Sequence, residues 1–319
     1  MIPKTILKRL DQKLQIIQSK RPLSTQLVKK LKEQFSFDLT YNSNAIEGNK
    51  LTLKETYLVI NDGMTVKGKS LKDHLEAKNH NEAVHFLYEL VEHNKKHTIS
   101  EQLIRSLQHI IIKDIEDNDA GRYRQGNVLI TGSSHKPPDA FKIPKLMEEL
   151  TNWIKKKSEK LHPVELASLA HHKLVHIHPF TDGNGRTARL FMNLILMQKG
   201  YPMVIILKND RQKYYRSLEK ADNKNTDDIE KFIAQAVERS LNIYLNAIES
   251  RPSKQNQLIT LSSLSKQSSF SSKYLNLLVR SGQLEAHKEG RIWLSSKKAL
   301  DDYLENRQRK RTQNKMKKP

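Results

Sequence analysis

The 319-residue chain has no cysteine, only two tryptophans and no apolar run long enough to cross a bilayer. Without cysteine it can form neither a disulfide nor a thiolate metal site, which fits a reducing compartment. A membrane helix needs about 18 or more consecutive apolar residues, so we expect no transmembrane segment. The N-terminus alternates charged and apolar side chains and lacks the apolar core of a signal peptide. These absences predict a soluble, cytoplasmic protein that does not bind membranes.

Positive charge is abundant and unevenly distributed. The chain has a net charge of +21; residues 251–319 carry +11, whereas residues 1–250 carry +10 over more than three times the length. A basic C-terminal region is typical of proteins that contact a polyanion, which predicts DNA binding through residues 258–319. The alternative is a solvated basic tail, because residues 307–319 alone hold seven positive charges.

Helical periodicity dominates the chain as far as residue 250, which predicts a mainly α protein. We expect an N-terminal helical region over residues 1–100 and a helical catalytic core over residues 101–250. Residues 121–138, here called the flap, interrupt this pattern with a short apolar run between two glycines, followed by two prolines. The flap is therefore predicted to be a small exposed β-hairpin or an extended segment.

The C-terminal region has a different pattern. Residues 251–257 contain a proline and no other apolar side chain, which predicts a linker. Residues 258–306 show two short helical patterns, an alternating segment and a third helical pattern, and this order resembles a small winged-helix (α+β) domain. The same fold also serves as an interaction domain without DNA. Residues 307–319 would form a basic tail.

The strongest motif is His178-Pro-Phe-Thr-Asp-Gly-Asn-Gly-Arg-Thr-Ala-Arg189, which leads into an apolar helix. A glycine-rich turn at a helix N-terminus presents backbone N–H groups to an anion. Arg186 and Arg189 are three residues apart, so both can reach one face and grip phosphates. Asp182 suits a Mg²⁺ ion, and His178 suits a general base because an unperturbed histidine pKa is about 6.5. Together these groups indicate transfer from a nucleoside triphosphate.

These twelve residues match H-x-F-x-[DE]-G-N-G-R-x-x-R and are similar to the motif of the Fic family, whereas a mere tight turn between core helices would leave eight constrained positions to coincidence. The resemblance implies a Fic helical core with a β-hairpin flap. It also implies a protein adenylyltransferase that moves AMP from ATP to Tyr, Thr or Ser hydroxyls, with His178 as catalytic base and Asp182 as the Mg²⁺ ligand. The implied ATP-binding residues are Gly183, Asn184, Gly185, Arg186, Arg189 and Tyr214.

Two further segments resemble the same family. In the family, the flap holds a target segment by main-chain pairing. A tyrosine after the motif helps to hold the adenine, and Tyr214 is preferred here over Tyr215. The family often has Ala-Asn where this chain has Ala221-Asp222, a difference that leaves the nucleotide choice open. The expected docking residues of the flap are Val128, Leu129, Ile130 and Thr131.

The segment Ser43-Asn-Ala-Ile-Glu47-Gly48-Asn resembles the inhibitory-helix motif of the family, [ST]-x-x-x-E-[GN]. The resemblance implies an inhibitory helix near residues 40–48, in which Glu47 pairs with Arg189 and displaces the γ-phosphate. In some relatives the same glutamate positions water to remove AMP, which implies de-AMPylation as a second activity. The alternative is a helix that ends at Gly48 with a solvated Glu47.

Two other patterns suggest different chemistry. Gly63–Ser70 matches the P-loop pattern, but no alternating β and α pattern surrounds it, and we interpret the match as coincidental. Substitution of Lys69 would then leave activity intact. His171, His172, His176 and His178 lack the glutamate of H-E-x-x-H, so we expect core or surface histidines rather than a zinc site.

Two alternative functions stay open. One is a DNA-binding transcriptional regulator with a vestigial Fic domain, and the other is a Fic transferase that uses another nucleotide. The expected partners are ATP and a target protein that the sequence does not identify, with self-modification included. A homodimer is also left open.

Overall fold

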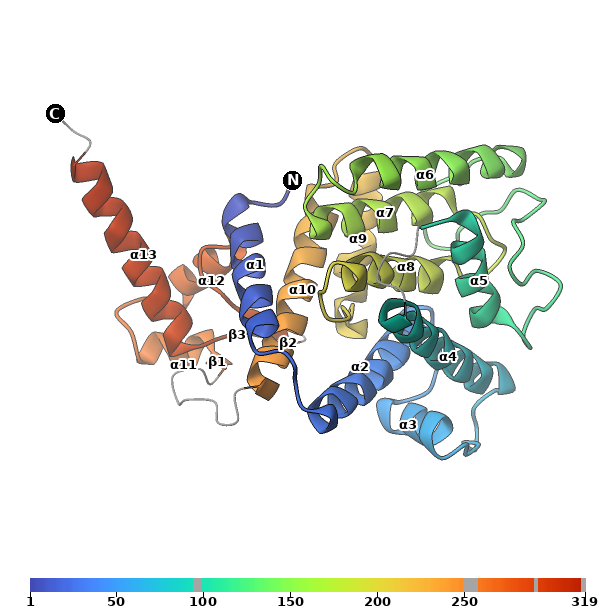
Figure 1. The fold of residues 1–319 in the computed structure, drawn as a ribbon, viewed down its shortest axis with the longest axis horizontal. Coiled ribbons are helices and arrows are strands. Elements are labelled where there is room, and N and C mark those ends of the chain that lie inside the picture. Colours follow the sequence, from blue (N-terminus) through green and yellow to red (C-terminus); the bar gives the residue numbers. More distant parts are fainter. Residues whose placement is uncertain (94–98, 249–257, 290–291, 317–319) are drawn as a thin grey trace. The chain divides into compact units, whose positions relative to one another are not determined.

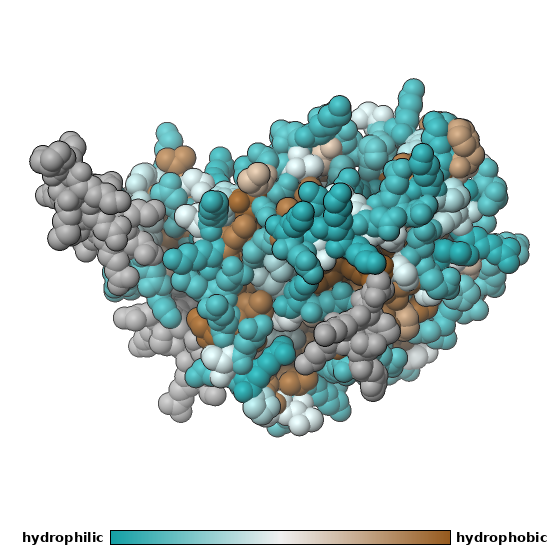
Figure 2. Space-filling view, turned by 45° about the horizontal axis from the view of Figure 1, so that its top comes forward, coloured by the Kyte–Doolittle hydropathy of each residue, from teal (hydrophilic) through white to brown (hydrophobic). Residues whose placement is uncertain are grey.

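A computed structural model describes residues 1–93, 99–248, 258–289 and 292–316 (Figure 1). The chain forms two compact units, one of residues 1–2 and 23–240, the other of residues 3–22 and 241–319. The predicted linker, residues 251–257, lies outside the described residues. None of the described helices combines the length and the apolar character that crossing a bilayer requires. The face drawn in Figure 2 is mostly hydrophilic, with smaller hydrophobic areas.

The first unit is helical throughout its described regular structure. Its helices are joined by short connections, and two of the connections contain single 3₁₀ turns, η1 (Ala140–Lys142) and η2 (Lys208–Asp210). The helices are α2 (Thr25–Ile46), α3 (Leu53–Asn61), α4 (Leu71–His93), α5 (Glu101–Ile112), α6 (Ile143–Lys157), α7 (Pro163–Ile177), α8 (Asn184–Gln198), α9 (Arg211–Asp222) and α10 (Asp227–Ile248), of which residues 241–248 belong to the second unit.

Helix α8 is the centre of the first unit and packs against α2, α4, α5 and α7 (Figure 1). Residues 186–197 of α8 are all buried, so this helix is enclosed on every side rather than along one stripe. Burial of a large apolar side chain contributes about 1.5–3 kcal/mol, so the helix that follows the motif is firmly fixed. The motif of residues 178–189 therefore leads into a fully buried helix at the centre of the unit.

The flap differs from the predicted β-hairpin: residues 121–138 contain no strand. They form an extended segment with one turn, in which the Ser133 amide donates to the Ile130 carbonyl at 3.1 Å. The β-hairpin prediction is therefore wrong, and the extended alternative describes the segment. The physical reason is that an isolated two-stranded hairpin is marginal in water unless it packs on other structure.

The second unit combines the first helix of the chain with its C-terminal part. Helix α1 (Lys4–Ser19) buries Leu10 and Ile17, and Arg9 Nη1 donates to the Gly282 carbonyl at 2.9 Å. The predicted division placed residues 1–100 in one region, whereas these contacts group residues 3–22 with residues 241–319. Contacts between segments so far apart in the chain are not visible in local periodicity.

The C-terminal elements follow the predicted order, and their assignment to the winged-helix class stays a prediction. A three-stranded antiparallel sheet has the order β1-β3-β2. Its helices bury a small leucine-rich core. The backbone of the last helix continues into the predicted tail. The elements are β1 (Ile259–Thr260), α11 (Leu261–Lys266), α12 (Ser272–Arg280), β2 (His287–Glu289), β3 (Ile292–Ser295) and α13 (Lys297–Met316).

Candidate active site

The loop between α7 and α8 is held by its own polar groups. Helix α7 ends at His178, whose backbone is left-handed with φ 50° and whose amide donates to the Leu174 carbonyl at 3.1 Å. The Asn184 side chain accepts from the Phe180 amide at 3.0 Å and donates to the Phe180 carbonyl at 2.7 Å. Asn184 is therefore a buried staple of the loop in this state rather than an exposed ligand. The staple leaves the glycine-flanked N-terminus of α8 in a defined position.

His178 is neutral at physiological pH. Burial lowers its pKa to about 4, nearby Arg124 acts in the same direction, and the Val175 carbonyl opposes the shift. A neutral imidazole has a lone pair and can accept a proton, whereas an imidazolium cannot. Its Nδ1 is buried, so Nε2 is the atom that can meet a hydroxyl group. His178 thus has the protonation state of a general base.

Asp182 lies in the loop between α7 and α8, and nearby cationic side chains balance the negative charge of its carboxylate. Burial raises its pKa, but Arg186, the Gly183 amide and Lys72 outweigh this and hold the pKa below its ordinary value. The shortest contact is from the Gly183 amide at 2.6 Å, and the Lys72 Nζ lies 3.8 Å from Oδ2. The side chain is 37 % exposed, so an oxygen remains open to a ligand. An ionised, partly exposed carboxylate fits a single Mg²⁺ contact, with phosphate and water as the other ligands.

Arg186 is clamped between two carboxylates, one of which the sequence did not suggest. Its Nη2 lies 3.3 Å from Asp182 Oδ2, and its Nη1 lies 3.1 Å from Glu76 Oε1 of α4. The second oxygen of Glu76 accepts from Asn49 Nδ2 at 2.9 Å. Glu76 is 8 % exposed, so this clamp is well removed from water. No local pattern marks Glu76, because its partners lie 27 and 110 positions away in the chain.

Arg189 is 1 % exposed and is held by Ser43 and Glu47, two of the three predicted residues of the inhibitory motif, the third being Gly48. Its Nη2 lies 2.8 Å from Glu47 Oε1, and its Nε donates to Ser43 Oγ at 2.9 Å. Arg189 Nη1 has no hydrogen-bond partner among the described residues. A Cβ added to Gly185 would collide with Glu47 Oε1, so glycine at this position permits the close approach of the carboxylate.

The turn after α2 explains why a glycine follows Glu47. Glu47 caps the C-terminus of α2, and Gly48 then adopts φ 103°, a conformation that other residues rarely adopt. The reversal returns the Asn49 amide to the Asn44 carbonyl at 3.1 Å. Gly48 therefore positions Glu47 through the backbone and makes no contact of its own with Arg189.

The two adjacent tyrosines of α9 face different surroundings. Tyr214 is 1 % exposed, and its hydroxyl lies 2.9 Å from His171 Nε2, so it offers no accessible face to a nucleotide in this state. Tyr215 lies instead beside the inhibitory motif, with its hydroxyl 3.5 Å from Glu47 Oε2. Sequence favoured Tyr214. In the structure the hydroxyl of Tyr215 lies beside Glu47, whereas Arg189 acts on the pKa of both tyrosines.

The flap is attached to the catalytic loop by Arg124, a second residue that the sequence did not suggest. Arg124 is 4 % exposed, and its guanidinium donates to the carbonyls of His178, Gly126 and Pro138 at 2.9, 2.8 and 2.5 Å. The predicted docking residues lie beyond this anchor, and Leu129 is 86 % exposed. The flap therefore has a fixed base and an open tip.

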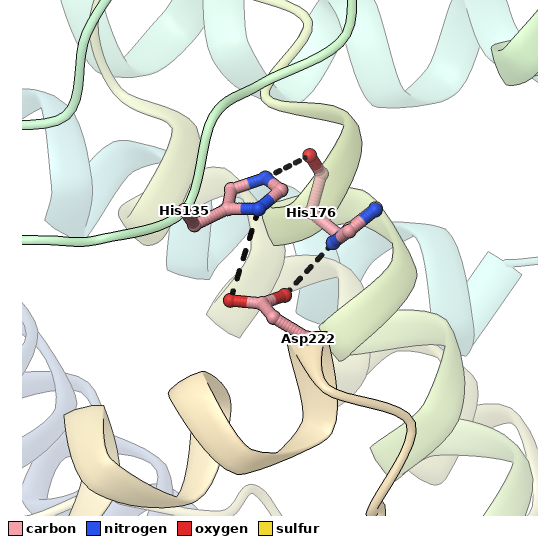
Figure 3. A group of neighbouring side chains, drawn as sticks. All are labelled: His135, His176 and Asp222. Atoms are coloured by element: carbon pink, nitrogen blue, oxygen red, sulfur yellow. Dashed lines mark hydrogen bonds and ion pairs between the residues drawn. The ribbon is translucent and has the colours of Figure 1, made fainter.

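Near Pro138, the flap residue His135 lies beside two histidines of α7, His172 and His176. His135 Nε2 lies 2.8 Å from the His176 carbonyl, and Asp222 at the end of α9 directs one carboxylate oxygen to each of the two rings (Figure 3). Asp222 Oδ1 is 2.8 Å from His176 Nδ1 and 3.0 Å from His172 Nε2. His171 lies apart from this cluster and bonds to Tyr214, as a core histidine was predicted to do.

The P-loop-like segment has a structural role. Lys69 Nζ donates to the Lys50 carbonyl at 2.6 Å and lies 3.3 Å from Glu55, while Ser70 Oγ accepts from the Asp73 amide at 3.1 Å at the start of α4. No strand precedes this segment within residues 1–93. The segment is a helix cap joined to α3 rather than a phosphate-binding loop between strand and helix.

Comparison with known proteins identifies similar sequences. A family model described as "Fic/DOC family" matches residues 98–196. A curated relative, "Protein adenylyltransferase Fic" of Nematostella vectensis, is 38% identical over 242 residues, which are 75% of this chain and 56% of the relative. The chain thus spans little more than half the length of that relative.

Solved structures give the same result for the fold. A Fic domain containing signaling protein from Bacteroides thetaiotaomicron is 31% identical with a TM-score of 0.67, and the match covers 77% of this chain and 97% of that one. Fic-1 from C. elegans is 29% identical with a TM-score of 0.70, covering 77% of this chain and 73% of that chain. These matches extend over most of the chain rather than over the motif alone.

Proposed function

The chain belongs to the Fic family, and we propose from this that it is a protein adenylyltransferase, which transfers AMP from ATP to a hydroxyl group of a protein. The observation that carries the proposal is the neutral His178 beside a stapled loop that ends in two buried arginines. A base next to a phosphate-binding loop is what nucleotidyl transfer to a hydroxyl requires. The name of the relative from Nematostella vectensis supports the same activity.

The proposed reaction is an in-line substitution at the α-phosphate. His178 Nε2 accepts the proton of the target hydroxyl, the oxygen forms a bond to the α-phosphorus, and the bond to the bridging oxygen of the β-phosphate breaks, which releases pyrophosphate. The histidine needs no activating partner to be neutral, because its pKa is already about 4. The left-handed backbone of His178 at the end of α7 directs its ring into the loop where the substrate would bind.

The phosphates are assigned to the N-terminus of α8. The amides of residues 183–185 would face the negative charge that develops at the α-phosphorus, and Arg186 and Arg189 would hold the β- and γ-phosphates. Asp182 would hold Mg²⁺, which supplies charge neutralisation to the phosphates when bound. Glu76 keeps Arg186 oriented, since its carboxylate fixes one side of the guanidinium. Tyr215 is better placed than Tyr214 to meet the nucleotide, because Tyr214 is closed off by His171.

We further propose that Glu47 inhibits this reaction. Its carboxylate occupies Arg189 Nη2 at 2.8 Å, so a γ-phosphate must compete with it for the same guanidinium. Glu47 remains 32 % exposed, which allows it to leave without unfolding of the core. The same carboxylate could position water for removal of AMP, so reversal of the modification belongs to this proposal.

The test compares self-labelling by α-labelled ATP and Mg²⁺ in the wild type, Glu47→Gly and His178→Ala. We expect weak label in the wild type, at least about tenfold more in Glu47→Gly, and none in His178→Ala. Equal labelling of the wild type and Glu47→Gly would exclude the inhibitory role. Label from another nucleotide but not from ATP would exclude the AMP assignment. Lys69→Ala serves as a control and should label like the wild type.

A second function, DNA binding by the second unit, is supported by the exposed face of α12. Lys273, Leu277 and Arg280 are exposed at helical spacing, while the opposite face is buried. A basic exposed helix after a turn is the element that reads a groove in helix-turn-helix proteins. A salt-dependent affinity for duplex DNA that falls on Lys273→Glu and Arg280→Glu would support this function, and no binding at low salt would exclude it.

A further inference from the structure

The steps of the proposed transfer do not use the cluster of His135, His176 and Asp222. It joins three segments that are distant in sequence: the end of the flap, the last turn of α7 and the last residue of α9 (Figure 3). One ligand-type atom from each residue lies within 4.8 Å of the others. The side chains of His135 and Asp222 are 9 % and 17 % exposed, whereas that of His176 is 41 % exposed, so the group is partly buried and open to solvent on the His176 side.

The hydrogen bonds leave two acceptors facing each other. His135 Nε2 lies 2.8 Å from the His176 carbonyl, which can only accept, so this nitrogen carries the ring proton. In the neutral ring Nδ1 is then an acceptor, and it faces Asp222 Oδ2 at 4.0 Å. Two acceptors at this distance cannot bond to each other. A cation between them would satisfy both.

The carboxylate is ionised and supported from behind. Burial raises the pKa of Asp222, but hydrogen bonds from His172 and His176 outweigh this and hold it well below its ordinary value. His172 Nε2 bonds to Oδ1 at 3.0 Å, which leaves Oδ2 directed toward His135. A metal-binding histidine usually donates its other N–H to a carbonyl, and a metal-binding carboxylate usually accepts a further hydrogen bond. Both supporting contacts are already present.

We propose that His135 Nδ1, His176 Nδ1 and Asp222 Oδ2 form a zinc site that fastens the flap to the catalytic core. Two imidazoles and one carboxylate are a common zinc ligand set, with water as the fourth ligand. Tetrahedral bonds of about 2.0 Å place ligand atoms roughly 3.3 Å apart. His135 Nδ1 and Asp222 Oδ2, now 4.0 Å apart, must therefore approach by about 0.7 Å, and no ligand pair, being within 4.8 Å, must move by more than about 1.5 Å. The proton on His176 Nδ1 moves to Nε2 of the same ring, and the ring stays neutral.

The site differs from the zinc site considered from sequence alone. The histidines of α7 lack a glutamate at the required spacing, but here the other ligands come from the flap and from α9. The residue from α9 is a carboxylate, and a carboxylate binds a divalent cation more strongly than a neutral amide does. The zinc ion would add a second attachment at His135, between the exposed tip of the flap and the base that Arg124 holds at Gly126 and Pro138.

The experiment measures Zn²⁺ binding to the full chain by competition with a chromogenic chelator, and Co²⁺ substitution by visible absorption. We expect one equivalent per chain in the wild type. Binding should weaken at least about 100-fold in His135→Ala and Asp222→Asn, and about tenfold in His172→Ala, which removes only a supporting contact. Two control variants should bind Zn²⁺ like the wild type. His85→Ala removes a surface histidine outside the cluster, and Asp182→Asn removes the proposed Mg²⁺ ligand but no proposed zinc ligand.

A second readout does not depend on nucleotide transfer. Zn²⁺ should slow amide hydrogen exchange in residues 128–135 of the wild type and leave exchange in His135→Ala unchanged. No Zn²⁺ binding by the wild type would overturn the proposal and leave a hydrogen-bonded clamp. Equal Zn²⁺ affinity in the wild type and His135→Ala would also overturn it. Because these measurements use no ATP, the zinc site and the transferase can each fail while the other stands.

Discussion

The catalytic loop and the flap lie next to each other, but they are held in opposite ways. The loop is closed by short contacts within itself, such as Asn184 to Phe180 at 2.7 and 3.0 Å, and it leads into a fully buried helix. The flap has no secondary structure of its own, and its tip residue Leu129 is 86 % exposed. An internally bonded loop suits a site that must position phosphates, whereas an exposed segment without secondary structure suits a surface that must accept a partner.

The largest effect should follow from breaking the joint between these regions. Arg124→Ala removes three hydrogen bonds and leaves the carbonyls of His178, Gly126 and Pro138 without this partner. We expect a loss of about 3 kcal/mol in the free energy of unfolding and at least a tenfold loss of labelling. Urea denaturation measures the first quantity. Arg122→Ala, at an exposed neighbouring position, is the matched control and should change stability by less than about 0.5 kcal/mol.

Sequence predicted the loop better than the flap because the loop is local. Residues 178–189 act on one another within four positions, so their spacing already describes their arrangement. The contacts of Arg124 with His178, of Glu76 with Arg186 and of Asp222 with His176 join segments more than 40 residues apart, and no periodicity reports them. The apolar run of the flap predicted a hairpin or an extended segment, and residues 121–138 form no strand, because a local pattern does not say whether a strand partner is present.

The same distinction separates Glu47 from Glu76. Both pair with arginines of the motif, and both lie on earlier helices or their caps. Glu47 could be placed because its segment resembles a family motif, while Glu76 has no such mark. Tyr214 and Tyr215 show a further limit of sequence-based prediction. Adjacent helix positions point in directions about 100° apart, and which of the two side chains faces a given site depends on how the helix packs.

The second prediction tests whether the loop is rigid through its own staple. Asn184→Ala removes both hydrogen bonds to Phe180 and leaves a buried amide and carbonyl without partners. We expect a loss of about 2 kcal/mol in the free energy of unfolding, with labelling reduced even at saturating ATP. Thermal denaturation and the dependence of labelling on ATP concentration separate the two effects. Unchanged stability would show that the loop is held from outside.

A third prediction concerns docking by the flap main chain. Proline has no N–H to donate to a partner strand, and only alternate amides of a strand face the partner. Two single substitutions, Leu129→Pro and Ile130→Pro, are compared in the Glu47→Gly background. Only one of them should reduce labelling of protein targets, by about fivefold, which corresponds to a loss of roughly 1 kcal/mol in binding free energy. Leu129→Ala keeps the amide and should have little effect. Equal losses in Leu129→Ala and Leu129→Pro would mean that side chains, not the main chain, hold the target.

The smallest expected change comes from pH and tests whether flap and loop are coupled through charge. With the pKa of His178 at about 4, a base is already neutral at pH 5.5, so labelling by Glu47→Gly should change less than about twofold between pH 7.5 and 5.5. A histidine with an ordinary pKa near 6.5 would lose about tenfold over this interval. Protonation below pH 4 removes the base, so the rate falls on the acid side. Burial is the main cause of the low pKa and Arg124 the next, so Arg124→Gln should move the acid limb toward higher pH. An acid limb that stays in place would show that the flap sets the position of the loop but not its charge.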